Sequence, residues 1–116
     1  MKRKRFTAED RLAIYKKTNG RCGYCGVKLG KFHIDHIVPI SCAQGSNEMK
    51  NLLAACPPCN NLKNTFTLEE FRKEIQAQAS RANKYSVNFR TALRFKQIVF
   101  PALPRPIKFY FEEIEG

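Results

Sequence analysis

The chain of 116 residues carries 21 Lys and Arg against 10 Asp and Glu, which gives a formal net charge of +11. This length predicts a single domain with a modest core and leaves no room for a second independent domain. The large positive charge predicts a polyanionic partner, with nucleic acid as the first candidate and an anionic membrane as the second.

The apolar segments and the cysteines indicate where the protein works. No apolar run follows the basic start of the chain, and no segment is apolar over the length that crosses a bilayer. No helix pattern combines a strongly basic face with a bulky apolar one, so we expect a cytoplasmic protein without a membrane partner. Five cysteines are an odd number for a disulfide framework, whereas two Cys-x-x-Cys pairs plus Cys42 are typical of a zinc protein.

The first 21 residues are predicted to form a short basic helix. Thr7 is typical of an N-cap, because the acidic Asp10 follows three residues later, and Gly20 is expected to end the helix. The glycines of the next segment, RCGYCG, let the backbone fold tightly around Cys22 and Cys25. This arrangement indicates a metal-binding knuckle.

The central part of the chain predicts the order strand, long loop, strand and helix. Residues 31–40 mix β-branched and aromatic side chains, and residues 41–50 contain the turn residues Gly-Ser-Asn. Residues 51–55 suit a second strand. Residues 57–64 suit a short helix, since proline is tolerated in the first helical turn.

Residues 66–116 are predicted to extend this core by helices and one strand. Thr67 and Glu70 form a capping-box pattern, and apolar residues then recur at helical spacing. Residues 81–108 contain seven basic and no acidic side chains and predict a further helix. Residues 107–111 alternate like a strand.

The two Cys-x-x-Cys pairs have the spacing of a tetrahedral zinc site. Zn²⁺ prefers four soft ligands, and each pair supplies two thiolates. Such a zinc ion would be structural, since four protein ligands leave no open position for chemistry. The alternative is four reduced cysteines without a special role. The expected ligands are Cys22, Cys25, Cys56 and Cys59.

Asp35 and His36 are adjacent, so on a strand their side chains point to opposite faces. This geometry suits a divided task, in which a carboxylate binds a hard metal such as Mg²⁺ and a neutral imidazole acts as general base. The alternative is an ordinary half-buried histidine, paired with Asp35 in a zinc-binding module that only binds DNA or RNA.

The segments RCGYCG, IDHIVPIS, GSN, NLLAAC and CPPCNNLKN occur in this order over roughly residues 20–65. They resemble the zinc-knuckle branch of the HNH endonuclease family of phages and bacteria, also called the ββα-metal or His-Me finger family. The resemblance implies an α+β fold with a small ββα-metal core and a structural zinc knuckle, here flanked by helices and a C-terminal strand. Within one domain over 1–116, the expected parts are a basic N-terminal helix, a zinc-stapled core and an extension, at 1–21, 22–65 and 66–116.

The resemblance also implies residue roles and cofactors. His36 would be the general base in the hydrolysis of DNA phosphodiester bonds, and Asp35 would bind one catalytic Mg²⁺ or Mn²⁺. Asn60 would be a second metal ligand, and Asn64 a further one, as in some members of the family. Asn51 would pin the loop by hydrogen bonds and so help to orient His36. Contacts to DNA are expected from Arg21, His33 and Lys63.

The basic residues concentrate at the two ends of the chain. Of the 21 Lys and Arg, 15 lie outside residues 22–80, eight before and seven after. They form either an ordinary solvated surface or arms that bind the DNA phosphate backbone, with affinity that falls steeply with salt. The alternative to an endonuclease is a non-catalytic zinc-binding module, acting as an accessory subunit of a larger DNA-processing or packaging complex. The composition does not predict a dimer.

Overall fold

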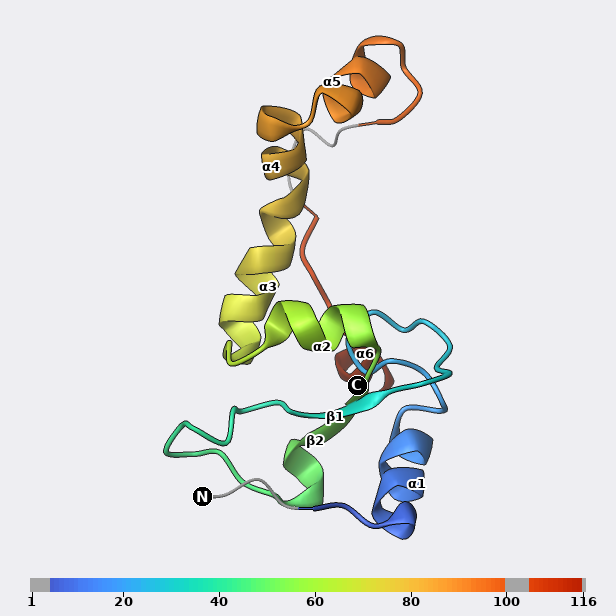
Figure 1. The fold of residues 1–116 in the computed structure, drawn as a ribbon, viewed down its shortest axis with the longest axis vertical. Coiled ribbons are helices and arrows are strands. Elements are labelled where there is room, and N and C mark those ends of the chain that lie inside the picture. Colours follow the sequence, from blue (N-terminus) through green and yellow to red (C-terminus); the bar gives the residue numbers. More distant parts are fainter. Residues whose placement is uncertain (1–4, 100–104, 116) are drawn as a thin grey trace. The chain divides into compact units, whose positions relative to one another are not determined.

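The computed structural model describes residues 5–99 and 105–115 (Figure 1). The chain divides into two compact units, one formed by Met1–Leu68 with Lys108–Gly116 and the other by Glu69–Ile107. The assignment of the whole chain to one domain stays a prediction. No helix in the described ranges is long and apolar enough to span a membrane.

A two-stranded antiparallel hairpin lies at the centre of the first unit. β1 (His33–His36) pairs with β2 (Leu52–Ala55), and Asp35 lies opposite Leu53. The long loop between the strands ends in a short 3-10 helix, η1 (Met49–Asn51), which leads directly into β2. All four residues of β2 are buried, so the strand is part of the core.

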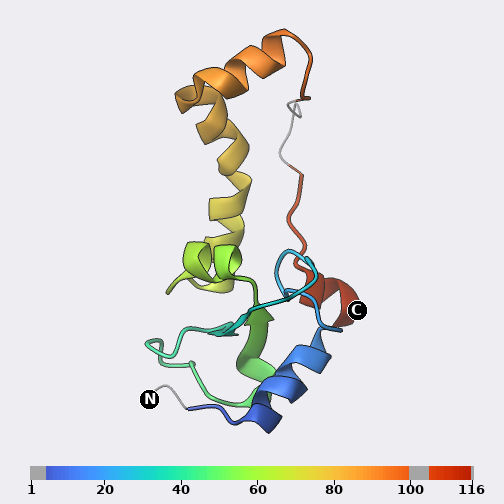
Figure 2. The same cartoon turned by 45° about the vertical axis from the view of Figure 1, so that its right-hand side comes forward.

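Two helices cover this hairpin. α1 (Ala8–Lys17) begins at the predicted capping box. The backbone amide of Thr7 donates to the side chain of Asp10, and the backbone amide of Asp10 donates to the side chain of Thr7. Ile14 of α1 is fully buried, and the helix packs against β2. α2 (Pro57–Lys63) starts with proline and packs against β1. Figure 2 shows the two helices on opposite sides of the hairpin. The order of the elements along the chain confirms the predicted order of strand, loop, strand and helix.

The end of the chain forms a helix, so the prediction of a strand over residues 107–111 is wrong. α6 (Tyr110–Glu115) follows an extended stretch, and Phe109 and Phe111 are both buried. Their rings pack edge-on against Tyr24, at centroid distances of 5.3 and 6.2 Å. The first two backbone amides of α6 donate to the carbonyls of Tyr24 and its preceding glycine. The alternating aromatic residues therefore fasten this segment to the knuckle instead of pairing it in a sheet.

The second unit is helical. It contains α3 (Leu68–Gln76), which begins directly after the predicted cap, α4 (Gln78–Tyr85) and α5 (Val87–Arg94). The hydroxyl of Ser86 caps α5 by accepting a hydrogen bond from the backbone amide of Phe89 at 3.1 Å. The first four residues of the predicted basic helix, and residues 100–104 of the predicted extension, lie outside the described residues.

Gly23→Ala is expected to lower the free energy of unfolding by about 1–3 kcal/mol, because a Cβ at this position overlaps the side chain of the fully buried Leu53. Gly30→Ala is the matched control, since a Cβ there meets nothing within 4 Å. Urea unfolding of both variants measures the difference. Equal stability of the two would show that the knuckle does not pack tightly on β2.

Candidate active site and metal centre

Four cysteine sulfurs form a cluster between the knuckle and the start of α2. The Sγ atoms of Cys22, Cys25, Cys56 and Cys59 all lie within 4.8 Å of one another, and those of Cys25 and Cys56 are 3.8 Å apart. Zn–S bonds of about 2.3 Å at tetrahedral corners place the sulfurs roughly 3.8 Å apart. The cluster therefore fits a structural zinc ion, and Cys42 is not part of it.

The cysteines of this cluster shift one another's pKa values in opposite directions. A hydrogen bond from the Cys59 thiol lowers the pKa of Cys22 to about 4, and the backbone amide of Cys56 donates to the same sulfur at 3.3 Å. The same thiol–thiolate bond raises the pKa of Cys59, and burial raises the pKa of Cys56. A zinc ion stabilises all four sulfurs as thiolates, because a coordinated thiol loses its proton.

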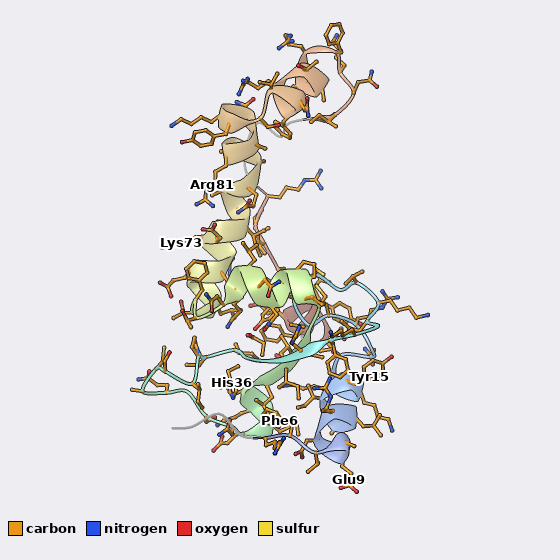
Figure 3. The ribbon with its side chains drawn as sticks, in the orientation of Figure 1. Phe6, Glu9, Tyr15, His36, Lys73 and Arg81 are labelled. Carbon is orange, nitrogen blue, oxygen red and sulfur yellow. The ribbon has the colours of Figure 1, made fainter. Side chains whose placement is uncertain are left out.

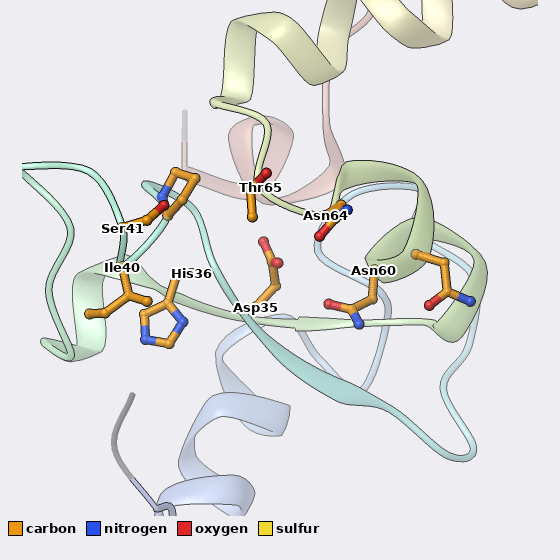
Figure 4. A pocket seen from close by; sticks show the side chains of 9 residues that line it. Asp35, His36, Ile40, Ser41, Asn60, Asn64 and Thr65 are labelled. Atoms are coloured by element: carbon orange, nitrogen blue, oxygen red, sulfur yellow. The ribbon is translucent and has the colours of Figure 1, made fainter. Parts of the chain in front are cut away.

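A pocket of about 490 Å³ opens beside β1 and α2 (Figure 4). Asp35 and His36 line it from β1, and Asn60 and Asn64 line it from α2 and its C-cap. Thr65 and the loop after β1 complete the lining. Four residues predicted for the catalytic centre therefore meet at one pocket.

The carboxylate of Asp35 is held by two donors on the same oxygen. The hydroxyl of Tyr24 donates to Oδ2, and the ammonium of Lys63 lies 3.0 Å from Oδ2. Asp35 is 3% exposed and Lys63 is 0% exposed. Burial and the charge of Asp35 raise the pKa of Tyr24 well above its ordinary value, so the hydroxyl stays protonated and acts as the donor. Among the described residues both donors bind Oδ2, and Oδ1 is the oxygen left for a ligand in the pocket.

Lys63 is buried, so its predicted role as a DNA contact is wrong. Its ammonium donates to the carbonyl of His36 at 2.9 Å and lies 5.9 Å from the centre of the Tyr24 ring. A cation with these partners in the interior does not reach a phosphate at the surface. Lys63 instead neutralises Asp35.

Arg21 and His33, the other predicted DNA contacts, are exposed but do not line the pocket. The guanidinium of Arg21 donates to the carbonyl of Gly26 at 3.0 Å, so it closes the knuckle turn. His33 begins β1, at the end of the strand away from His36. Their contact with DNA stays a prediction.

His36 is held by Asn47 from the long loop. The Nε2 atom of His36 lies 2.9 Å from Oδ1 of Asn47, and this amide oxygen can only accept, so Nε2 donates. In the neutral imidazole this bond leaves the lone pair on Nδ1. Figure 3 shows Phe6 beside His36, and their ring centroids are 6.4 Å apart. The imidazole therefore has both a fixed orientation and a fixed tautomer.

Asn51 ties the two ends of the loop together. Its side chain exchanges two hydrogen bonds with the backbone of Val38, at 2.8 and 3.0 Å, and donates to the carbonyl of Ser46 at 2.9 Å. Its own carbonyl accepts from the amide of Ile37 at 2.9 Å. These bonds fix the backbone directly after His36, which is the arrangement that a loop-pinning role requires.

Tyr24 and Asn47 belong to this site, although neither was singled out from the sequence. Tyr24 lies between Cys22 and Cys25, where an aromatic residue is expected to pack in the core. Asn47 lies in the Gly-Ser-Asn segment, where an asparagine is read as a turn residue. Only the folded chain brings their side chains to Asp35 and His36.

The purified protein is expected to retain about one zinc ion per chain through dialysis, and the double variant Cys56→Ser, Cys59→Ser is expected to lose the ion and to unfold. Cys42→Ser is the matched control, because Cys42 lies outside the cluster. Elemental analysis and circular dichroism measure both effects. Retention of zinc by the double variant would overturn the assignment of the four ligands.

Known proteins share the motif and part of the sequence. Residues 22–66 match the family model described as HNH endonuclease. YoqL, an SPbeta prophage-derived candidate HNH endonuclease of Bacillus subtilis (strain 168), is 30% identical over 69 residues, an alignment that covers 46% of this chain. The match spans only 27% of the length of that relative.

The fold resembles that in the crystal structure of the Type II-C Cas9 enzyme from Actinomyces naeslundii. The TM-score is 0.50 at 24% sequence identity, and the likeness covers 80% of this chain and 11% of that one. At this identity the likeness concerns the fold alone, and it confirms the predicted α+β class. Residues 22–66 of this chain are therefore similar to the HNH endonuclease family.

Proposed function

We propose that this protein is a DNA endonuclease that hydrolyses phosphodiester bonds with the help of one divalent metal ion. The observation that carries the proposal is one pocket that is lined by His36 and by the oxygen-bearing residues Asp35 and Asn60. The match of residues 22–66 to the HNH endonuclease family model supports a nuclease-type function. A cytoplasmic location and a place beside a larger DNA-processing or packaging complex stay predictions.

The ligands of the pocket fit an oxygen-seeking cation such as Mg²⁺ or Mn²⁺. Asp35 and Asn60 would hold it through a carboxylate and a carboxamide oxygen, and Asn64 offers a further carboxamide. When bound, such a cation stabilises the negative charge that develops on the phosphate and on the leaving oxygen. The ammonium of Lys63 balances the charge of Asp35, which favours weak and exchangeable binding, because affinity rises with ligand charge.

His36 is suited to take a proton from the attacking water. Its Nε2–H is donated to Asn47, so Nδ1 carries the lone pair that accepts the proton. Asn51 supports this arrangement, because it holds the carbonyl of Ser46, the residue directly before Asn47. The orientation of the base therefore depends on a short series of hydrogen bonds through the loop.

The second unit offers a basic surface for the phosphate backbone of DNA. Residues 75–99 contain five basic and no acidic side chains. Arg81, labelled on α4 in Figure 3, pairs with Glu74, whereas Arg94 and Lys96 are exposed and have no acidic partner among the described residues. Contacts of this kind supply affinity without sequence information.

His36→Ala is expected to lower the nicking of supercoiled plasmid in Mg²⁺ or Mn²⁺ by about 10²–10⁴-fold, because the general base is lost. EDTA should stop nicking by the wild-type protein. His33→Ala is the matched control, since it removes the same side chain from the same strand outside the pocket. At saturating DNA, where a lost DNA contact no longer limits the rate, it should cut at close to the wild-type rate. Gel electrophoresis of the plasmid forms gives the rates.

Two outcomes would contradict the proposal that the protein is an endonuclease. One is a wild-type protein that never nicks with either metal, and the other is a His36→Ala variant that cuts as fast as wild type. In both cases the alternative, a non-catalytic zinc-binding module that binds nucleic acid, would take its place. A single pocket cuts one strand at a time, so nicked circles should appear before linear DNA.

Replacing Arg94 and Lys96 by Gln is expected to weaken DNA binding equally on unrelated sequences. The slope of log affinity against log salt should fall by about 0.9 for each lost phosphate contact. Arg81→Gln is the control and should change the slope less, because Arg81 is already paired with Glu74. Fluorescence anisotropy over a salt series measures the slopes. An unchanged slope in the double variant would remove Arg94 and Lys96 from the DNA-binding surface.

A further inference from the structure

The residue between the two knuckle cysteines reaches the candidate active site. Tyr24 lies between Cys22 and Cys25 in the chain, and its hydroxyl donates to Oδ2 of Asp35. One side chain therefore spans the distance from the cysteine cluster to the pocket. Lys63 holds the same carboxylate oxygen from α2.

The position of the Tyr24 hydroxyl is set by the knuckle and by the C-terminal segment. The residue is 3% exposed, and its ring packs edge-on against Phe109 and Phe111. Its backbone carbonyl accepts from the amide of Tyr110 at 3.0 Å. A ring enclosed on these sides has little freedom to move, so its hydroxyl holds the Asp35 carboxylate in a fixed position.

The contact also decides how Asp35 meets a ligand. Because Tyr24 and Lys63 both bind Oδ2, they hold the carboxylate in one orientation and leave Oδ1 as the oxygen for a ligand. Removing a group that hydrogen-bonds to a metal ligand ordinarily lowers metal affinity or activity by about 10- to 100-fold.

We propose that Tyr24 is a positioning residue that couples the cysteine cluster to Asp35. The knuckle then has a second task beside stapling the fold, because it sets the orientation of a ligand of the cutting centre. The inference rests on the proposed function, since it takes Asp35 as a ligand of the catalytic ion. It also predicts that disorder of the cysteine cluster would release Tyr24 and with it Asp35, and by linkage that a metal ion bound at Asp35 would stabilise the cluster.

Tyr24→Phe tests the inference, because it removes the hydroxyl and keeps the ring between Phe109 and Phe111. Binding of Mn²⁺ to the zinc-loaded protein without DNA, followed by the electron paramagnetic resonance signal of free Mn²⁺, is expected to weaken about 10- to 100-fold. Zinc content and the unfolding midpoint should stay close to wild type. Tyr15→Phe is the matched control, since no hydrogen bond of the Tyr15 hydroxyl exists among the described residues.

A role through metal affinity also has a kinetic signature. Nicking by Tyr24→Phe should recover toward the wild-type rate as Mn²⁺ is raised, whereas a merely misfolded centre would stay slow at every concentration. If Tyr24→Phe loses zinc, Phe109→Leu provides the second test. It keeps the hydroxyl but loosens the packing behind it, and it should weaken Mn²⁺ binding at full zinc content.

The outcomes separate the inference from the function on which it rests. Wild-type affinity for Mn²⁺ in Tyr24→Phe with full zinc would overturn the coupling and leave the endonuclease intact. Where Phe109→Leu has to be used, unchanged Mn²⁺ affinity in that variant overturns it in the same way. A wild-type protein that binds no Mn²⁺ would remove the metal site of the proposed function, and the inference with it.

Discussion

The sulfur cluster holds together two segments on which the rest of the first unit depends. The knuckle and the start of α2 are separated along the chain by the whole hairpin, yet their four sulfurs lie within 4.8 Å of one another. Two strands of four residues are too short to be stable alone. A zinc ion at the cluster would close the chain around them, so that folding and metal binding become one event. The pocket lies where α2 packs beside β1, next to this cluster.

Within the first unit, the site is organised by buried polar groups that are joined by hydrogen bonds and an ion pair. An unpaired buried carboxylate is costly, and breaking a buried ion pair from one side costs about 3–5 kcal/mol. Lys63 and the Tyr24 hydroxyl together satisfy Oδ2 of Asp35, which keeps the carboxylate in place near the surface of the pocket. Asn47, from the long loop, holds the imidazole of His36 in a comparable way. The strand thus carries two chemically different groups, and each is fixed by a neighbour from another segment.

Chemistry and DNA affinity fall to different parts of the chain in this proposal. The pocket belongs to the first unit. Arg94 and Lys96, which have no acidic partner among the described residues, belong to the second. Phosphate contacts and phosphate hydrolysis are both indifferent to base identity. A preference for particular DNA sites would therefore need contacts beyond those described. The chain spans 27% of the length of YoqL, so the activity of that whole protein is a separate matter.

The sequence by itself determined the features that depend on short spacings. Two Cys-x-x-Cys pairs, the adjacent Asp35 and His36, and the cap of α1 are local patterns, and each lies where the spacing predicts. The tertiary structure decided the contacts between distant segments. A lysine in a basic chain predicts a surface residue, and only the packing of α2 against β1 buries Lys63 on Asp35. The alternating aromatic residues at the end of the chain also fit a strand. Only the fold shows that Phe109 and Phe111 pack against the ring of Tyr24. Local pattern therefore indicated the candidate ligands, whereas burial and long-range packing decided which groups orient them.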